Sequence, residues 1–160
     1  MAITKTVALV HDKAYAGMVA DLQLANRVSR FNATSAVIPF GTAVQADTDA
    51  GSMKPIASGG TAIGVLVREL VDVTNPGSEQ GVNVGKTGTV LTDGVIWVKA
   101  YEAVTVGGNV FAGVGATVKG YFCADVGSEY TEAVQITGAK YLDAASAKGD
   151  LVRIKITIGG

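Results

Sequence analysis

The segment GVNVGKTG (81–88) contains residue types that could bind the phosphates of a nucleotide. Its Gly-Lys-Thr end matches the phosphate loop of P-loop NTPases, in which backbone N–H groups surround the phosphates and a lysine, here Lys86, reaches the outer ones. The full pattern needs a glycine where Gln80 stands, and Gly81 makes the loop one residue too short. A phosphate loop also joins a buried strand to a helix, whereas the turn-rich NPGSEQ (75–80) precedes this one and a strand-like segment follows it. We therefore expect a glycine-rich loop that leads into a strand, and no nucleotide binding.

Other groupings of chemically active residue types are also incomplete. Residues 47–51 (DTDAG) begin like a calcium loop, but the glycine comes one residue early and a serine replaces the glutamate required at position 12. His11 is the only histidine and Cys123 the only cysteine, so a multi-histidine metal site and a histidine-activated thiol both lack parts. Glu129 and Glu132 lie in a polar segment with nothing to separate their pKa values. We predict that the protein is not an enzyme and has no catalytic residue, cofactor-binding residue or metal ligand.

Composition limits the partners that the chain can have. Only 17% of the residues are charged, against about 25% in average soluble proteins. The mean hydropathy is +0.34 without an apolar run of about 18 residues, which argues against a membrane span and favours apolar surface packed against other subunits. A net charge of −1 provides no basic field for nucleic acid or anionic lipid. Residues 1–20 lack the apolar centre of a secretory signal, so synthesis without export is expected.

The hydrophobic pattern after residue 36 predicts a mainly β fold, a single small β-barrel or β-sandwich. Short apolar runs are separated by glycine-rich turns, and in the last run Val152, Ile154 and Ile156 alternate with polar residues. We expect strands at 150–158, 94–101, 63–70 and 121–124, main loops at 51–60 and 75–81, and Cys123 and Trp97 in the core.

The first 36 residues differ from the rest and are expected to form an N-terminal arm attached to a β domain of residues 37–160. Within 14–31, Met18 shares a possible helix face with three residues farther along, but Gly17 and Asn26 weaken a helix. A short helix and an extended arm that becomes ordered on a partner both remain open.

An ordered series of segments resembles the small cement, or decoration, proteins of tailed-bacteriophage capsids. The segments are AYAGMVAD (14–21), NRVSRFN (26–32), VIPFGTAV (37–44), AIGVLVRE (62–69), GTVLTDGVIWVKAYEAVTVGGNVF (88–111) and GDLVRIKI (149–156). The resemblance implies a non-enzymatic virion protein, made in the host bacterial cytoplasm, that binds the outer surface of the icosahedral capsid. It would bridge major capsid protein subunits as a homo-oligomer, a trimer being favoured over a dimer, and stabilise the head. The segments 75–86 and 131–142 do not match the family, and we expect them to be loops particular to this protein's lattice.

The N-terminal segment is the predicted contact with a neighbouring subunit. We expect the side chains that make it to be Tyr15, Met18, Arg27, Arg30 and Phe31. The simpler alternative is that this segment packs on its own β domain. A different function, a host-surface or carbohydrate-binding module of a virion, also uses β-sandwiches and would require exposed aromatic residues in a groove.

Overall fold

A computed structural model describes residues 14–21, 25–49, 51–69, 80–115, 118–125 and 132–158. Within them the chain forms eleven β-strands and no helix, so none of them belongs to a helix able to cross a membrane. The strands are β1 (Asn26–Asn32), β2 (Ile38–Pro39), β3 (Ala43–Ala46), β4 (Ser52–Pro55), β5 (Ala62–Leu66), β6 (Gly81–Val82), β7 (Thr87–Ala100), β8 (Asn109–Gly113), β9 (Tyr121–Cys123), β10 (Ala133–Tyr141) and β11 (Leu151–Thr157). The predicted mainly β fold is confirmed.

Strand β7 is the longest, with 14 residues, and it is paired along both edges. Along one edge it pairs first with β1, from Phe31↔Thr87 to Asn26↔Asp93, and then with β11. Along the other edge it pairs with β5, then with Val19 through an isolated bridge to Ile96, and finally with β9. The change from β1 to β11 occurs at Asp93, next to Gly94, whose φ of 137° is rare for other residues.

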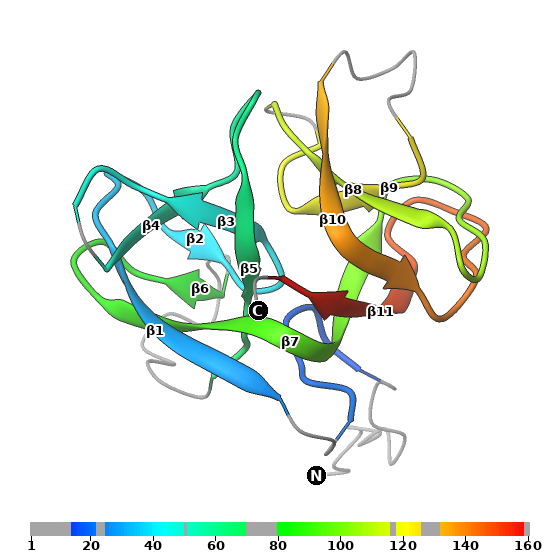
Figure 1. Cartoon of the computed structure of the whole chain (residues 1–160), viewed down its shortest axis with the longest axis horizontal. Coiled ribbons are helices and arrows are strands. Elements are labelled where there is room, and N and C mark those ends of the chain that lie inside the picture. The colour runs from blue at the N-terminus through cyan, green and yellow to red at the C-terminus, as the bar shows by residue number, and fades with distance from the viewer. Residues whose placement is uncertain are drawn as a thin grey trace, which may run out of the picture.

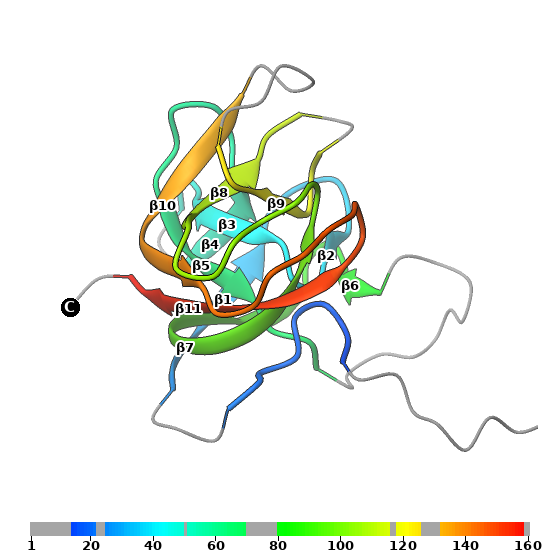
Figure 2. The ribbon, with the colours of Figure 1, turned by 90° about the vertical axis from the view of Figure 1, so that its right-hand side faces the viewer.

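These pairings close two circuits of five strands that share β7 (Figures 1 and 2). The first is the barrel β1-β4-β3-β5-β7, in which only β1 and β4 run parallel. The second runs β7-β11-β10-β8-β9 and closes through the parallel pairing of β9 with the end of β7. The small sheet of β2 and β6 lies beside the first barrel. Closure leaves few unpaired strand edges, which suits a protein with few surface charges.

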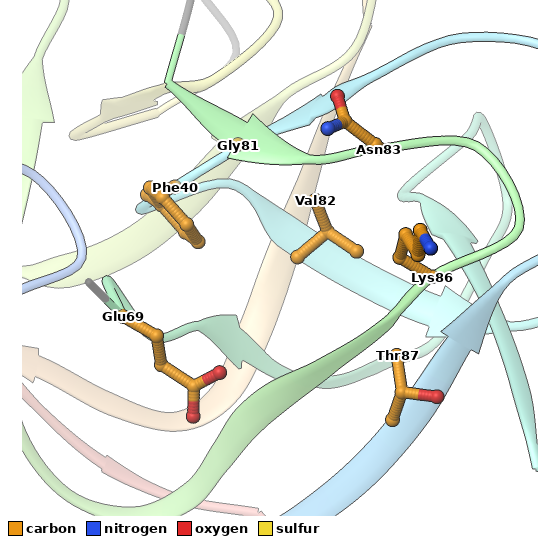
Figure 3. Close-up of a pocket in the computed structure, with 7 residues that line it drawn as sticks. All are labelled: Phe40, Glu69, Gly81, Val82, Asn83, Lys86 and Thr87. Carbon is orange, nitrogen blue, oxygen red and sulfur yellow. The ribbon is translucent and has the colours of Figure 1, made fainter. Parts of the chain in front are cut away.

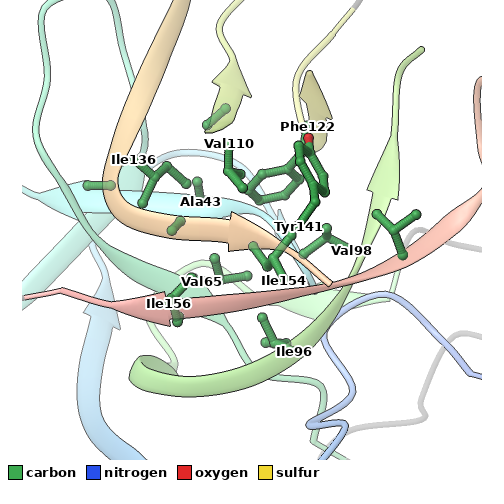
Figure 4. Close-up of a cluster of buried hydrophobic side chains, with 14 of the residues drawn as sticks. Ala43, Val65, Ile96, Val98, Val110, Phe122, Ile136, Tyr141, Ile154 and Ile156 are labelled. Atoms are coloured by element: carbon green, nitrogen blue, oxygen red, sulfur yellow. The ribbon is translucent and has the colours of Figure 1, made fainter. Parts of the chain in front are cut away.

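The shared wall between the two circuits is buried on both of its faces. Val65 and Leu91 belong to the larger hydrophobic cluster, whereas their neighbours Leu66 and Val90 belong to a second cluster with Ile38. Consecutive residues in β5 and β7 are therefore apolar because each face of these strands packs against a different hydrophobic cluster. The larger cluster (Figure 4) includes Ala43, Val65, Ile96, Val98, Val110, Phe122, Ile136, Tyr141, Ile154 and Ile156.

The strands expected at 150–158, 94–101, 63–70 and 121–124 are confirmed as β11, β7, β5 and β9. The expected loop at 51–60 is wrong, because β4 lies inside it and pairs with β3. The segment 131–142 is likewise no loop where it is described, since β10 occupies most of it. Most of the expected loop at 75–81 lies outside the described residues. β4 is mostly polar in sequence and gains its structure from pairing with β3, whereas β10 interrupts its apolar pattern at Gly138.

The helix considered for 14–31 is wrong in its described part, where residues 26–32 form β1, residues 16–17 form a turn and residues 18–20 run along β7. Pairing with a long existing strand outweighs a weak local helix preference. Cys123 is buried as expected, but Trp97 is only half-buried. Its ring lies on the outer face of β7, with the Arg153 guanidinium 5.6 Å from its centroid. The predicted core position for Trp97 is therefore wrong.

Gly64 allows β5 and β7 to approach closely, since a β-carbon there would overlap the carbonyl oxygen of Leu91. We predict that Gly64→Ala lowers the free energy of unfolding by about 1–3 kcal/mol beyond its backbone strain. Gly59→Ala is the matched control, because Gly59 also has a positive φ but nothing lies within 4 Å of the added carbon. Chemical denaturation of both variants makes the comparison, and equal losses would contradict the close approach.

The Tyr141 hydroxyl is buried in the larger core and donates a hydrogen bond of 2.9 Å to the Cys123 carbonyl oxygen. Burial raises the pKa of Tyr141, with smaller contributions from Cys123 and Glu102. Above pH of about 10 the unfolded chain ionises this tyrosine while the folded chain resists, so stability falls as pH rises. We predict that Tyr141→Phe lowers stability by about 1–3 kcal/mol at pH 7 and makes it less sensitive to alkaline pH. Urea unfolding between pH 7 and 11 tests this, with Tyr121→Phe as the control; parallel pH profiles for wild type and Tyr141→Phe would refute it.

Candidate partner interface

The N-terminal segment is fixed to β7 by its backbone and leaves two large side chains exposed. Gly17 N–H donates to the Trp97 carbonyl oxygen at 2.8 Å, and Trp97 N–H donates to that of Met18 at 2.9 Å. The backbone of this segment therefore packs on its own β domain. The side chains of Tyr15 and Met18 remain 45% and 40% exposed. Because the backbone of this segment is hydrogen-bonded to β7, Tyr15 and Met18 stay on the surface, where they are suited to contact another protein.

Gly17 determines how closely this segment can pack. A β-carbon at Gly17 would lie 2.7 Å from the Gly41 nitrogen, so two glycine backbones meet here without side chains between them. Arg68 N–H donates to the Gly17 carbonyl oxygen at 2.6 Å, and the Arg68 guanidinium lies 4.7 Å from the Tyr15 ring centroid. The cation–π contact with Arg68 favours this orientation of the Tyr15 ring.

Strand β1 is exposed on both of its faces over most of its length. Arg27, Val28 and Phe31 are all exposed, although successive residues of a strand point to opposite sides. Only the last two residues of β1 pair with β4, so the first five are paired on the β7 edge alone. β1 thus belongs to a closed barrel but leaves two large apolar side chains, Val28 and Phe31, exposed to solvent.

The end of β1 is anchored by Asn32, which is fully buried. Its amide donates hydrogen bonds of 2.9 Å to the carbonyl oxygens of Ala36 and Val82, and its side-chain oxygen accepts from Thr34. Arg30 lies two residues before Asn32 on the same side of β1. Its Nε is buried and donates no hydrogen bond to the described residues. Within the described part of the chain, this donor carries the free-energy cost of an unmade hydrogen bond.

The five predicted contact residues therefore fall into two groups along β7. Tyr15 and Met18 lie beside Trp97, and the group of Arg27, Arg30 and Phe31 lies beside residues 87–91 of the same strand. Sequence reasoning missed two members of the second group. Val28 is 36% exposed on β1, and Val84 is 51% exposed in the turn whose Gly85 N–H donates to the Asn32 carbonyl oxygen. The signal for Val84 was an apolar residue inside a glycine-rich loop.

The same turn decides the question raised by the Gly-Lys-Thr sequence. Lys86 N–H donates to the Asn83 carbonyl oxygen at 3.1 Å, and Gly85 N–H is also bonded within the chain, so neither points at a ligand. Thr87 begins strand β7 and not a helix. A phosphate cradle needs free N–H groups and a helix N-terminus, and this turn provides neither.

A surface groove of about 340 Å³ lies next to this turn (Figure 3). Its lining residues are Phe40, Glu69, Gly81, Val82, Asn83, Lys86 and Thr87. Phe40 is the one aromatic ring among them, so the lining lacks the set of exposed aromatics expected of a carbohydrate-binding module. Among the described residues there is also no cluster of three or more His, Cys, Asp or Glu side chains that could hold a metal ion. His11 lies outside the described residues.

Comparison with known proteins gives the family. The model of the structural cement proteins (E217 gp24/Pam3 gp6) matches residues 3–157. The chain belongs to the structural cement protein family. Among solved structures, a chain from the capsid of Myoviridae phage XM1 has the same fold, with a TM-score of 0.72, 20% identity and 98% of each chain covered. No curated protein sequence matches the chain. The cement protein therefore has a structural, capsid-stabilising role in a bacteriophage virion.

We predict that Lys86→Gln in this cement protein leaves the free energy of unfolding within about 0.5 kcal/mol of wild type, as is usual for exposed positions. We also predict no measurable binding of ATP by either form, because the turn uses its N–H groups internally. Thermal unfolding with and without millimolar Mg-ATP measures both. A nucleotide-dependent rise in melting temperature that the substitution abolishes would contradict this assignment.

Proposed function

We propose that the cement protein binds the outer surface of the capsid and bridges major capsid protein subunits, without enzymatic activity. The observation that supports this most is β1, a barrel strand with Val28 and Phe31 exposed on opposite faces. A monomer gains nothing from such an arrangement. A capsid subunit that covers β1 would bury both apolar side chains.

The second group, Tyr15 and Met18, would extend the same contact along β7. Tyrosine and arginine are the residue types that contribute most often to binding energy at interfaces, and here the Arg68 guanidinium contacts the Tyr15 ring. We propose further that the protein is made in the host bacterial cytoplasm and decorates the head as a homo-oligomer, a trimer in preference to a dimer. Several modest contacts around a symmetry axis multiply weak affinities into stable attachment.

The experiment uses heads that lack the protein and measures how much purified protein they bind. We predict that Val28→Ser with Phe31→Ser weakens binding by about tenfold or more, because the loss of an apolar hot spot costs about 2 kcal/mol. Point substitutions are required, since removal of residues 1–30 would take away most of β1 and open the barrel.

Val106→Ser is the matched control, because Val106 is the most exposed large apolar side chain of the described residues, at 65%, and lies away from β1. It should bind as wild type does, and all variants should keep the wild-type melting temperature within a few degrees. Undiminished binding by the folded double variant would remove β1 from the interface. Failure of the wild-type protein itself to bind heads would reject the proposed function.

A further inference from the structure

The outer face of β7, β11 and β10 carries a concentration of cations. Along β11 the even-numbered residues are buried, so Arg153 and Lys155 point outward, and the same alternation exposes Lys99 on β7 and Lys140 on β10. These strands lie side by side in the second circuit (Figure 1). We name Lys99, Lys140, Lys148 and Lys155 the lysine face. Together with Arg153, the lysine face holds five of the chain's 13 Lys and Arg residues.

Two of these lysines are placed against each other by the register of the sheet. Lys140 and Lys155 are directly opposed across β10 and β11, and both are exposed. Like charges in directly opposed positions destabilise a sheet. The Lys140 ammonium donates a hydrogen bond of 2.8 Å to the Asn109 side-chain oxygen, which carries no charge to balance it. The pair therefore lowers stability unless a charge outside the described residues neutralises it.

Among the described residues, no carboxylate lies within 4 Å of the Lys140 or Lys155 ammonium. The ion pairs of these residues are Lys54 with Asp47 and Arg153 with Asp143, at 2.9 and 2.7 Å. Asp143 also accepts a hydrogen bond of 2.8 Å from Arg153 Nε, so this carboxylate is fully engaged by the arginine. No lysine of the lysine face forms an ion pair within the described part of the chain. Within the described part of the chain, Arg153 has a carboxylate partner and the lysines around it have none within 4 Å.

The other two lysines are held against tyrosine rings. Lys99 is paired in register with Tyr121, and the Lys148 ammonium lies 4.2 Å from the Tyr101 ring centroid and 5.4 Å from that of Tyr121. The loop that carries Lys148 is fixed by the Asp150 carboxylate, which accepts hydrogen bonds from two backbone N–H groups. Fixed cations lose less side-chain entropy when a partner binds than mobile surface lysines do.

We propose that the lysine face binds an acidic protein surface of the virion, at a contact separate from β1. This inference rests on the proposed function, since it assigns a second partner surface to the same protein. Carboxylates are favoured over nucleic acid because the nearby rings are already covered, Trp97 by Arg153 and Tyr101 by Lys148, and base stacking needs open rings. Because β7 belongs to both circuits, it holds β1 and the lysine face at a fixed separation, as attachment to two neighbouring subunits requires.

The test replaces Lys140 and Lys155 together by glutamine. The K140Q/K155Q protein should bind cement-free heads about tenfold more weakly, with a shallower dependence on salt, because two charges no longer contribute. Its melting temperature should equal or exceed that of wild type, since the repulsion between the pair is gone. A merely structural role for the lysines predicts the opposite change in stability. The control is K119Q, which removes a positive charge at an exposed position outside the lysine face and should bind as wild type does.

Two soluble probes separate this inference from the proposed function. An oligoglutamate peptide should bind the wild-type protein at low salt, bind K140Q/K155Q several-fold more weakly, and compete with heads, whereas oligothymidylate should do none of these. Equal head or peptide binding by wild type and K140Q/K155Q overturns the lysine face, as does competition by oligothymidylate alone. If wild type does not bind heads, the proposed function fails, and the peptide comparison still decides the lysine face. If only the β1 variants lose head binding, the proposed function stands and the lysine face is rejected.

Discussion

Backbone pairing along both edges of β7 is the interaction on which the rest of this cement protein depends. One edge carries β1 and then β11, and the other carries β5, the segment around Val19 and then β9. Both five-stranded circuits close only through this strand. Its side chains serve two cores, with Val90 in one and Leu91 in the other. A register shift in β7 would exchange these faces and disturb both cores at once.

This arrangement explains how a chain with few charges remains a stable folded unit while keeping apolar side chains on its surface. The cores are formed without Val28, Phe31, Tyr15 or Met18, so these residues are available for contacts with other proteins. The proposed β1 contact and the lysine face lie on different circuits. Apolar burial would provide affinity at the first, and charge complementarity would provide orientation at the second.

Segments with strong internal patterns were predictable. β11 alternates three buried aliphatic residues with polar ones, and β7 is rich in β-branched and aromatic residues, so both were found. Segments that depend on a neighbour were not. β4 (SMKP) has one strongly apolar residue, Met53, and becomes a strand because β3 and the end of β1 pair with it. In β1 (NRVSRFN) neither face is fully covered by the chain, and its sequence has no alternation of apolar and polar residues. The period-of-two signal of a strand is therefore missing. Tyr15, Met18 and Phe31, which the sequence predicts as partner contacts, are exposed, but the division of the predicted contacts into two groups could not be foreseen.

The sequence by itself determined the mainly β class, the strands with a clear period of two, and the rejection of a phosphate loop, because these follow from residue types a few positions apart. Tertiary structure alone decided that β7 is shared by two circuits and that Trp97 lies outside the core. It also decided that Lys140 faces Lys155 across two strands. Such facts depend on register between segments distant in the chain, and register is set by the packing of all the strands together and not by any local pattern.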